Sequence, residues 1–538
     1  MFSLYSALCG VFSLFCFIIF LLLGERGGLL FDFVFCSIGR FDVRLVFLFD
    51  WVSLLFYGFI SFICGFVFLY RFFYMGEDWL IYRFSSLVFL FYLSMFFLVF
   101  GGNFFVTMVG WDGLGVTSFF LVVFYQNFSS GVSGLITVYT NRLGDAFFLI
   151  SFFWFLCNGY WRYDRLFFGF VLLSFLILLG CFTKRAQVPF SAWLPAAMRA
   201  PTPVSSLVHS STLVTAGVYV LVRYNLLVFC GFWVGVLSVF TVFLSGFVSF
   251  FEFDLKKLVA ISTLSQLGVM SYGLFVGMWK FAFLHMLVHA LFKAVLFLSV
   301  GSLITSVGGR QDFVLFGFEW YFFSYFIFFC RGLCLCGFPF FIGFYSKDFI
   351  LWGGSFFCLF LWVVFLVGCL FTVFYVFRLY RLVFSKVLST GCFLVGHFSF
   401  FLFFNFLFFW LGFVFFGGFV FWLVLGSILY WIDGLVLLFG VFLLGLGFLF
   451  VFMIYIFFLV FVKLGFLYYI SGRGFSSFIR WIRLFVFGDY TWMEEVGAQG
   501  VFFHLDLFGK MVGNVLMVIT FFGTMSAFFF VLVVFVFV

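Results

Sequence analysis

The chain has 538 residues, of which 67% are hydrophobic and 9% are charged. A soluble domain has about a quarter of its residues charged, so this composition excludes a soluble globular protein and indicates a chain that crosses a membrane many times. The net charge of +8 is spread among loops and not gathered in one run, which argues against nucleic acid as a partner and fits contact with anionic membrane lipids.

Apolar runs recur along the whole chain at the length of about 20 residues that a helix needs to cross a bilayer. We therefore expect an all-α membrane protein with about fifteen transmembrane helices. The first run, Leu4 to Leu23, has no basic segment and no small-residue cleavage site, so we expect a retained helix and not a signal peptide. Residues 1–82 are expected to hold the N-terminal helices and a short hairpin, because Phe31 to Trp51 partly alternates between polar and apolar residues.

Residues 83–386 are expected to form the functional core. They hold nearly all the charges expected at mid-membrane, which are Asp112, Arg142, Asp145, Lys184, Arg223, Lys293 and Lys347. Each such charge costs about 2.5 to 3.5 kcal/mol at the bilayer centre, so several in one region indicate a function. Arg142 and Asp145 are one helical turn apart and suit a local ion pair. Asp112 needs a partner from another helix, and we expect Lys184, which would hold or release a proton as that pair forms or breaks.

Prolines mark two expected interruptions of the helices. Four of the five lie in one short stretch, at Pro189, Pro195, Pro201 and Pro203. Proline breaks helices, and a broken helix is tolerated in lipid only where it is buried in protein or lines a watery cavity. Lys184 precedes this break and His209 follows it, so we expect the site here. The fifth, Pro339, stands before Lys347 and Asp348 and predicts a second break.

The residues His285, His289 and Lys293 are four positions apart, so on a helix they project from nearly one face. This spacing favours a ladder of groups that exchange protons. Two other interpretations are a metal held by the histidine pair, although the glutamate of a zinc motif is missing, and haem, which needs histidines on facing helices. For His209 alone, a structural histidine with satisfied hydrogen bonds is also an open interpretation.

The C-terminal part carries no visible chemistry. Residues 387–470 are long apolar runs and are expected to be scaffold helices. The polar segment 471–515 predicts an amphipathic helix along the membrane surface, because its polar residues from Glu495 to Asn514 fall on one face. Residues 516–538 are long enough to form an anchoring span.

At these residues the chain resembles the chain 5 family of respiratory NADH-ubiquinone oxidoreductase (complex I), antiporter-like proteins related to subunits of multi-component cation/proton antiporters. The matching stretches are GWDGLG, YTNRLGD, TKRAQVPFSAWLPAAMRAPTPVSSLVHSSTLVTAGVYVLVR, DLKKLVAISTLSQLG, HMLVHALFKAVLFLSVGS, GFPFFIGFYSKDFIL and FYVFRLYR. The tail, with GDYTWMEEVGAQG and the amphipathic segment, resembles the lateral helix and anchor of this family.

The resemblance implies a core of two inverted repeats, each with a discontinuous helix, that translocates protons. The residues that match the family's proton path are Asp112, Arg142, Asp145 and Lys184 where protons enter, His209, His285, His289 and Lys293 along a hydrophilic axis, and Lys347 with Asp348 on the exit side. The chain departs from the family in having Asp112 in place of glutamate, so that a water is expected between it and Lys184. It also has Arg199 where an acidic or small residue is more common.

The resemblance further implies a mitochondrially encoded subunit of the NADH-oxidising, quinone-reducing enzyme of the mitochondrial inner membrane. No cofactor is expected in this chain, because its thirteen cysteines lack the spacing of an iron–sulfur or zinc site, and flavin mononucleotide, iron–sulfur clusters and ubiquinone are expected in partner subunits. The expected partners are other membrane-arm subunits, above all antiporter-like chains along the lateral helix, and lipids. Two alternatives are a cation/proton antiporter subunit without electron transfer and a structural clamp that does not pump.

Overall fold

The computed structural model describes residues 2–384 apart from 25–26, 39–40, 77–79, 158–170, 225–226, 307–308, 310, 312–321, 339–340 and 356–357. The described residues all belong to one compact unit of the chain. The expected scaffold helices of 387–470, the amphipathic segment 471–515 and the anchor 516–538 lie outside the described residues, and so does Pro339.

The N-terminal part consists of two helices with a β-hairpin between them. Helix α1 (Phe2–Leu23) is followed by strands β1 (Gly28–Ile38) and β2 (Phe41–Asp50), which pair antiparallel, and then by α2 (Trp51–Tyr74). The Ser53 hydroxyl accepts the backbone N–H of the last strand residue at 2.9 Å, which fixes the point where strand becomes helix. The hairpin expected from the alternating pattern is therefore confirmed.

Four further helices lead to the proline-rich break. They are α3 (Ile81–Phe100), α4 (Phe104–Val122), α5 (Phe128–Cys157) and α6 (Val171–Lys184). Helix α3 packs against α4, and α5 packs against α6. The close approach of α3 and α4 requires Gly110, because a Cβ there would lie 2.8 Å from the Cα of Leu98.

The proline cluster ends α6 and divides the next span into short pieces. These are α7 (Trp193–Ala196), the 3-10 turn η2 (Ala197–Arg199), α8 (Thr202–Val204), the π-helical segment η3 (Ser205–Thr212) and α9 (Leu213–Tyr224). Within η3, Ser211 and Thr212 both donate to the carbonyl of Leu207, at 2.9 and 2.6 Å. A π-helix pairs its carbonyls with backbone N–H groups five residues on, and these side-chain hydroxyls add further hydrogen bonds to the same carbonyl, so the irregular segment has no need of water. The expected break is confirmed.

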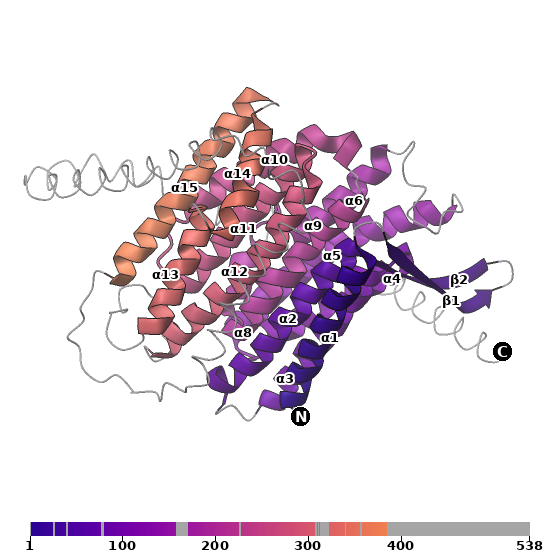
Figure 1. The fold of residues 1–538 in the computed structure, drawn as a ribbon, viewed down its shortest axis with the longest axis horizontal. Coiled ribbons are helices and arrows are strands. Elements are labelled where there is room, and N and C mark those ends of the chain that lie inside the picture. Colours follow the sequence, from indigo (N-terminus) through magenta and orange to yellow (C-terminus); the bar gives the residue numbers. More distant parts are fainter. Residues whose placement is uncertain are drawn as a thin grey trace, which may run out of the picture. The chain divides into compact units, whose positions relative to one another are not determined.

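The other described helices gather around α12. They are α10 (Leu227–Val248), α11 (Leu255–Phe275), α12 (Trp279–Ser306), α13 (Phe322–Cys336), α14 (Ile342–Gly354) and α15 (Leu359–Phe384). Helix α12 contacts α2, η3, α11, α13 and α14 and lies in the interior of these helices (Figure 1). Its apolar stretch is wholly buried, whereas that of α1 is mostly exposed. Polar residues on α12 are therefore shielded from the lipid.

The described residues contain nine helical segments that are long and apolar enough to cross a membrane. Their ends match the apolar runs of the sequence, beginning with Leu4–Leu23 and ending with Leu359–Tyr380. The chain is therefore a mostly helical, multi-pass membrane protein. The expectation of about fifteen helices concerns the whole chain and includes residues outside the described part.

Candidate functional site

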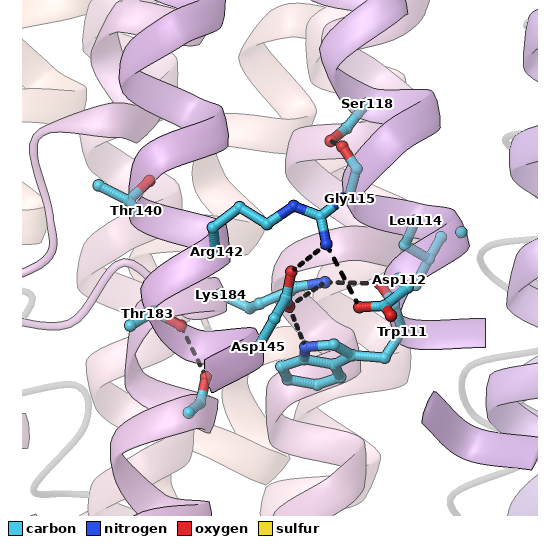
Figure 2. A network of polar contacts seen from close by, with 12 residues as sticks. Trp111, Asp112, Leu114, Gly115, Ser118, Thr140, Arg142, Asp145, Thr183 and Lys184 are labelled. Carbon is cyan, nitrogen blue, oxygen red and sulfur yellow. Dashed lines mark hydrogen bonds and ion pairs between the residues drawn. The ribbon is translucent and has the colours of Figure 1, made fainter. Parts of the chain in front are cut away.

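Lys184 ends helix α6 with its side chain fully buried against α4. Its Nζ donates a hydrogen bond of 2.7 Å to the backbone carbonyl of Trp111 and lies 4.3 Å from the centre of the Trp111 ring. The same Nζ is 3.9 Å from Oδ1 of Asp145 on α5. Figure 2 shows these side chains converging from three helices. A carbonyl oxygen, an aromatic face and a carboxylate thus surround the amine, and each attracts positive charge.

Asp145 is the buried centre of this group. Its Oδ1 accepts a hydrogen bond of 2.8 Å from Nε1 of Trp111, and its Oδ2 accepts one of 3.2 Å from Arg142. The expected local ion pair of Arg142 and Asp145 is confirmed. Because Lys184 approaches the same carboxylate from α6, one buried anion is shared by two cations. A proton added to Asp145 would weaken both ion pairs at once.

Asp112 makes no direct ion pair with Lys184, although its charge acts on the Lys184 amine, and the expected link through a water stays a prediction. Its Oδ1 lies 3.8 Å from Arg142, and its side chain is 44% exposed, whereas that of Lys184 is fully buried. Successive side chains on a helix point about 100° apart, so Trp111 turns toward Lys184 while Asp112 turns toward the exposed face of α4. Arg142 therefore bridges Asp112 to Asp145, and the ion pairs connect Asp112 to Lys184 through these two residues (Figure 2).

The charges of Asp112, Arg142, Asp145 and Lys184 balance when all four groups are ionised. Arginine keeps its charge in proteins, so the proton that can change position lies on Lys184 or on a carboxylate. Loss of the Lys184 proton leaves the group with one net negative charge, beside the buried carboxylate of Asp145. Such a site attracts the next proton, and the arrangement therefore suits its temporary storage.

His209 lies in the π-helical segment beyond the break. Trp193, between Lys184 and this segment, donates its Nε1 to the carbonyl of Thr183 at 2.8 Å, which ties the interrupted chain to the last turn of α6. The ring of His209 is buried 6.0 Å from the Trp193 ring, and neither of its nitrogens has a hydrogen-bond partner. No protein group in the described part of the chain satisfies this ring, and the interpretation of His209 as a structural histidine stays open beside that of a proton carrier.

Lys293 and His289 lie side by side on α12. Lys293 donates from Nζ to the hydroxyl oxygen of Ser262 on α11 at 2.6 Å. The ring of His289 is 6.5 Å from the ring of His285, and neither nitrogen of His289 has a hydrogen bond to another described residue. The three basic residues thus follow one another along one helix, as their spacing predicts. Within the described ranges, no three His, Cys, Asp or Glu side chains come together as a metal site.

His285 stands at the end of this ladder, where α12 meets α11 and α14. Its Nδ1 is 2.8 Å from Oγ of Ser346, and its Nε2 is 3.2 Å from Oε1 of Gln266. Lys347, the residue after Ser346, lies close enough for its charge to act on the imidazole. The expected axis and the expected exit side are therefore neighbours in the fold.

Lys347 is held by the interruption between α13 and α14. Its Nζ donates to the carbonyls of Leu335 and Cys336, at 3.5 and 3.4 Å, and to the hydroxyl of Thr372 on α15 at 3.2 Å. These carbonyls belong to the last turn of α13, where no further helical N–H follows. Asp348 is buried beside it, and its Oδ2 has no hydrogen-bond partner. A lysine and a carboxyl group of α14 thus lie next to this second interruption.

Two arginines singled out in the sequence lie apart from the buried groups. Arg223, expected at mid-membrane, sits in the last turn of α9 and pairs with Asp50 at 2.7 Å, at the start of α2. Arg199 is exposed and donates to the carbonyl of Ser129 near the start of α5. Neither arginine adds a charge to the buried groups described above.

Sequence reasoning missed several polar residues of the site. Lys256 is buried on α11 and donates from Nζ to the carbonyl of Ala200 at 3.4 Å, beside the proline cluster. Its neighbour in the sequence, Lys257, pairs with Asp254, and nothing in the LKK triplet distinguishes the buried lysine. The indole of Trp111 was also missed, because scarcely any sequence signal separates a polar contact from ordinary apolar packing in so aromatic a chain.

Two family profiles match this chain. The profile described as NADH:quinone oxidoreductase/Mrp antiporter, TM matches residues 101–374. The profile described as NADH-Ubiquinone oxidoreductase (complex I), chain 5 N-terminus matches residues 35–85. The first match includes every expected site residue from Asp112 to Asp348.

Similar curated proteins share the printed name NADH-ubiquinone oxidoreductase chain 5. The Locusta migratoria protein is 46% identical over 326 residues, which are 59% of this chain and 57% of that protein. The Lumbricus terrestris protein is 45% identical over 285 residues, 52% of this chain and 50% of that protein. The Anopheles arabiensis protein is 44% identical over 335 residues, 59% of this chain and 85% of that protein. The chain thus spans little more than half the length of several relatives.

A solved structure supports the fold. The chain is similar to a chain in the structure of the Mrp complex from Dietzia sp. DQ12-45-1b, with a TM-score of 0.69 and 21% sequence identity. The match covers 96% of this chain and 60% of that chain. At this identity the likeness shows a common fold and nothing about substrate or activity.

Proposed function

This chain belongs to the NADH:quinone oxidoreductase/Mrp antiporter family, and we propose that it is a proton-translocating subunit in the membrane arm of a respiratory NADH-ubiquinone oxidoreductase. The observation that supports this most directly is a series of buried basic residues inside apolar helices, namely Lys184, His209, His285, His289, Lys293 and Lys347. Each is expensive to hold as a cation in a membrane, so a purely structural role does not explain six of them.

In this proposal Lys184 is the proton store on the uptake side. Electron transfer in partner subunits alters the pairing between Asp145 and its two cations, which releases or recaptures the Lys184 proton. Moving one charge against a membrane potential of 100 mV costs about 2.3 kcal/mol, which is comparable to the energy of a buried ion pair. The proton then passes to the histidines and Lys293, and leaves past Lys347 and Asp348.

The finer architecture belongs to the same proposal. Two interruptions, one after α6 and one between α13 and α14, support a core of two inverted repeats with discontinuous helices. Residues 471–515 would lie along neighbouring antiporter-like subunits, and residues 516–538 would anchor them. Flavin, iron–sulfur clusters and ubiquinone would be bound by partner subunits, and the membrane would be the mitochondrial inner membrane.

Purification under mild detergent tests the assignment to a respiratory complex. The chain is expected to co-migrate with NADH-oxidising activity and with bound flavin. A chain that migrates without flavin, in an assembly that exchanges sodium or potassium for protons in liposomes, would instead be an antiporter subunit. A chain that co-migrates with flavin while substitution of Lys184 leaves proton transport intact would be a structural clamp.

A further inference from the structure

Tyr375 brings a buried hydroxyl group from α15 close to the part of α11 where Ser262 accepts the amine of Lys293, a residue of α12. The Tyr375 side chain is fully buried. Its hydroxyl lies beside the side chains of Ser262, Ser265 and Gln266, but within the described part of the chain none of them reaches full hydrogen-bond geometry with it. Buried polar atoms almost always have a partner, and an exception calls for a specific explanation such as a bound water.

A second polar atom at this place also has no protein partner. The amide of Gln266 is oriented by its Oε1, which lies 3.2 Å from Nε2 of His285, while its buried Nε2 has no hydrogen bond to a residue that the structure describes. An amide nitrogen donates, whereas a phenol hydroxyl both donates and accepts. A buried water typically makes about three hydrogen bonds. Tyr375 and Gln266, together with the neighbouring serine hydroxyls, supply that number.

Ser262 links this place to Lys293. Its hydroxyl oxygen accepts the Lys293 amine at 2.6 Å, and its hydroxyl hydrogen points to the carbonyl of Val259 at 2.8 Å. A hydroxyl hydrogen rotates freely about the C–O bond. Ser262 can therefore redirect its donor from Val259 toward a ligand that Tyr375 holds, while it remains in contact with Lys293.

We infer that Ser262, Ser265, Gln266 and Tyr375 bind water between α11 and α15, and that Tyr375 is a further residue of the proton relay, connected to Lys293 through Ser262. The inference rests on the proposed function. The Lys293 ammonium gives one proton to the Ser262 oxygen as Ser262 passes its own proton to the bound water. Lys293 becomes neutral, Ser262 is unchanged, and the water holds the extra proton while the Tyr375 oxygen accepts a hydrogen bond from it; the reverse exchange through Ser262 returns the proton to Lys293. No electron moves.

Tyr272 offers a matched control for Tyr375. It lies on α11, is also fully buried, and its hydroxyl also has no hydrogen-bond partner. Its ring, however, stacks on Phe365 at 4.1 Å within a separate apolar cluster. Tyr272→Phe and Tyr375→Phe therefore remove the same atom from equally buried sites, and only one of these sites adjoins a relay lysine.

The test uses the complete NADH-oxidising complex in liposomes, with proton uptake and NADH oxidation recorded together in H2O and D2O. Tyr375→Phe is expected to slow proton uptake about tenfold, equivalent to about 1.4 kcal/mol, and to increase the solvent isotope effect, because proton transfer past Lys293 becomes limiting. Tyr272→Phe is expected to match the parent complex in both respects. Equal behaviour of the two variants would overturn the inference.

Two further variants keep the outcome decisive. If Tyr375→Phe fails to assemble, Ser265→Ala removes another hydroxyl of the same water site and is expected to give the same slowing and isotope effect; unchanged kinetics would refute the site. Lys184→Ala separates this inference from the proposed function. If Lys184→Ala stops proton uptake while Tyr375→Phe does not, the relay stands and the role of Tyr375 fails. If neither changes uptake, the proposed function itself fails.

Discussion

Replacing Asp145 by asparagine is expected to impair this protein far more than the same change at Asp112. Asp145 is 5% exposed and lies 3.2 Å from Arg142, 3.9 Å from Lys184 and 2.8 Å from the Trp111 indole nitrogen. Asp145→Asn leaves the buried Lys184 and the half-exposed Arg142 facing a neutral amide. Asp112 is 44% exposed and its one ion pair, to Arg142, is 3.8 Å long, so its charge is held by fewer contacts.

The two magnitudes follow from this difference in burial. Removing one partner of a buried ion pair costs about 3 to 5 kcal/mol, and Asp145→Asn should fall near the lower end because the amide oxygen can still accept from Trp111. A loss of about 3 kcal/mol is a factor of about 100 in the unfolding equilibrium. An exposed pair contributes about 0 to 1 kcal/mol, which sets the upper limit for Asp112→Asn.

The stabilities of the two variants are compared by thermal unfolding of the purified complex in detergent. The unfolding is monitored through the loss of this chain's helical signal. Asp145→Asn is expected to lower the unfolding midpoint clearly and to reduce proton uptake, whereas Asp112→Asn is expected to stay close to the parent in stability. A larger destabilisation by Asp112→Asn would refute the assignment of Asp145 as the carboxylate partner of Lys184.

Two further predictions concern packing and pH. Gly110→Ala should destabilise the chain by about 1 to 3 kcal/mol through overlap with the α3 backbone, whereas Gly131→Ala on α5, where a Cβ meets nothing within 4 Å, should cause no loss; equal midpoints in thermal unfolding would contradict the close approach. Burial raises the pKa of the Glu252 carboxyl in the connection between α10 and α11, partly opposed by Lys257. A raised folded-state pKa means that Glu252 contributes stability below its unfolded pKa of about 4.3 that is lost as pH rises through the folded-state pKa. Glu252→Gln should therefore unfold at a higher temperature than the parent at pH 8, with the difference vanishing below about pH 4; a lower temperature at pH 8 would show that the ionised carboxylate is stabilising.

Features that depend on local sequence were predictable. Runs of apolar residues mark the spans, the alternation after Phe31 marks the hairpin, and the proline cluster marks the broken helix. The spacing of His285, His289 and Lys293 places them on one face of one helix. Each of these inferences uses a short stretch of chain and a fixed helical or strand period, so neighbouring helices have no influence on them.

Contacts between helices were not predictable in the same way. Lys184 was assigned to Asp112 because Asp145 already had a local partner, but a buried carboxylate can serve two cations at once. The rotation of α4 decides which of Trp111 and Asp112 faces Lys184, and a helix with apolar residues on all sides carries no pattern that sets its rotation. Arg223 was misplaced for a related reason, since span ends are poorly marked where loops are as apolar as helices.

The central claim is that Lys184 carries the translocated proton, and proton uptake per NADH oxidised tests it most directly. The measurement compares Lys184→Ala with Lys280→Ala, which removes a half-buried lysine near the start of α12, in assembled complexes of equal flavin content in liposomes. The account predicts that Lys184→Ala lowers the number of protons taken up per NADH while Lys280→Ala retains the parent value. An unchanged ratio in Lys184→Ala would contradict it.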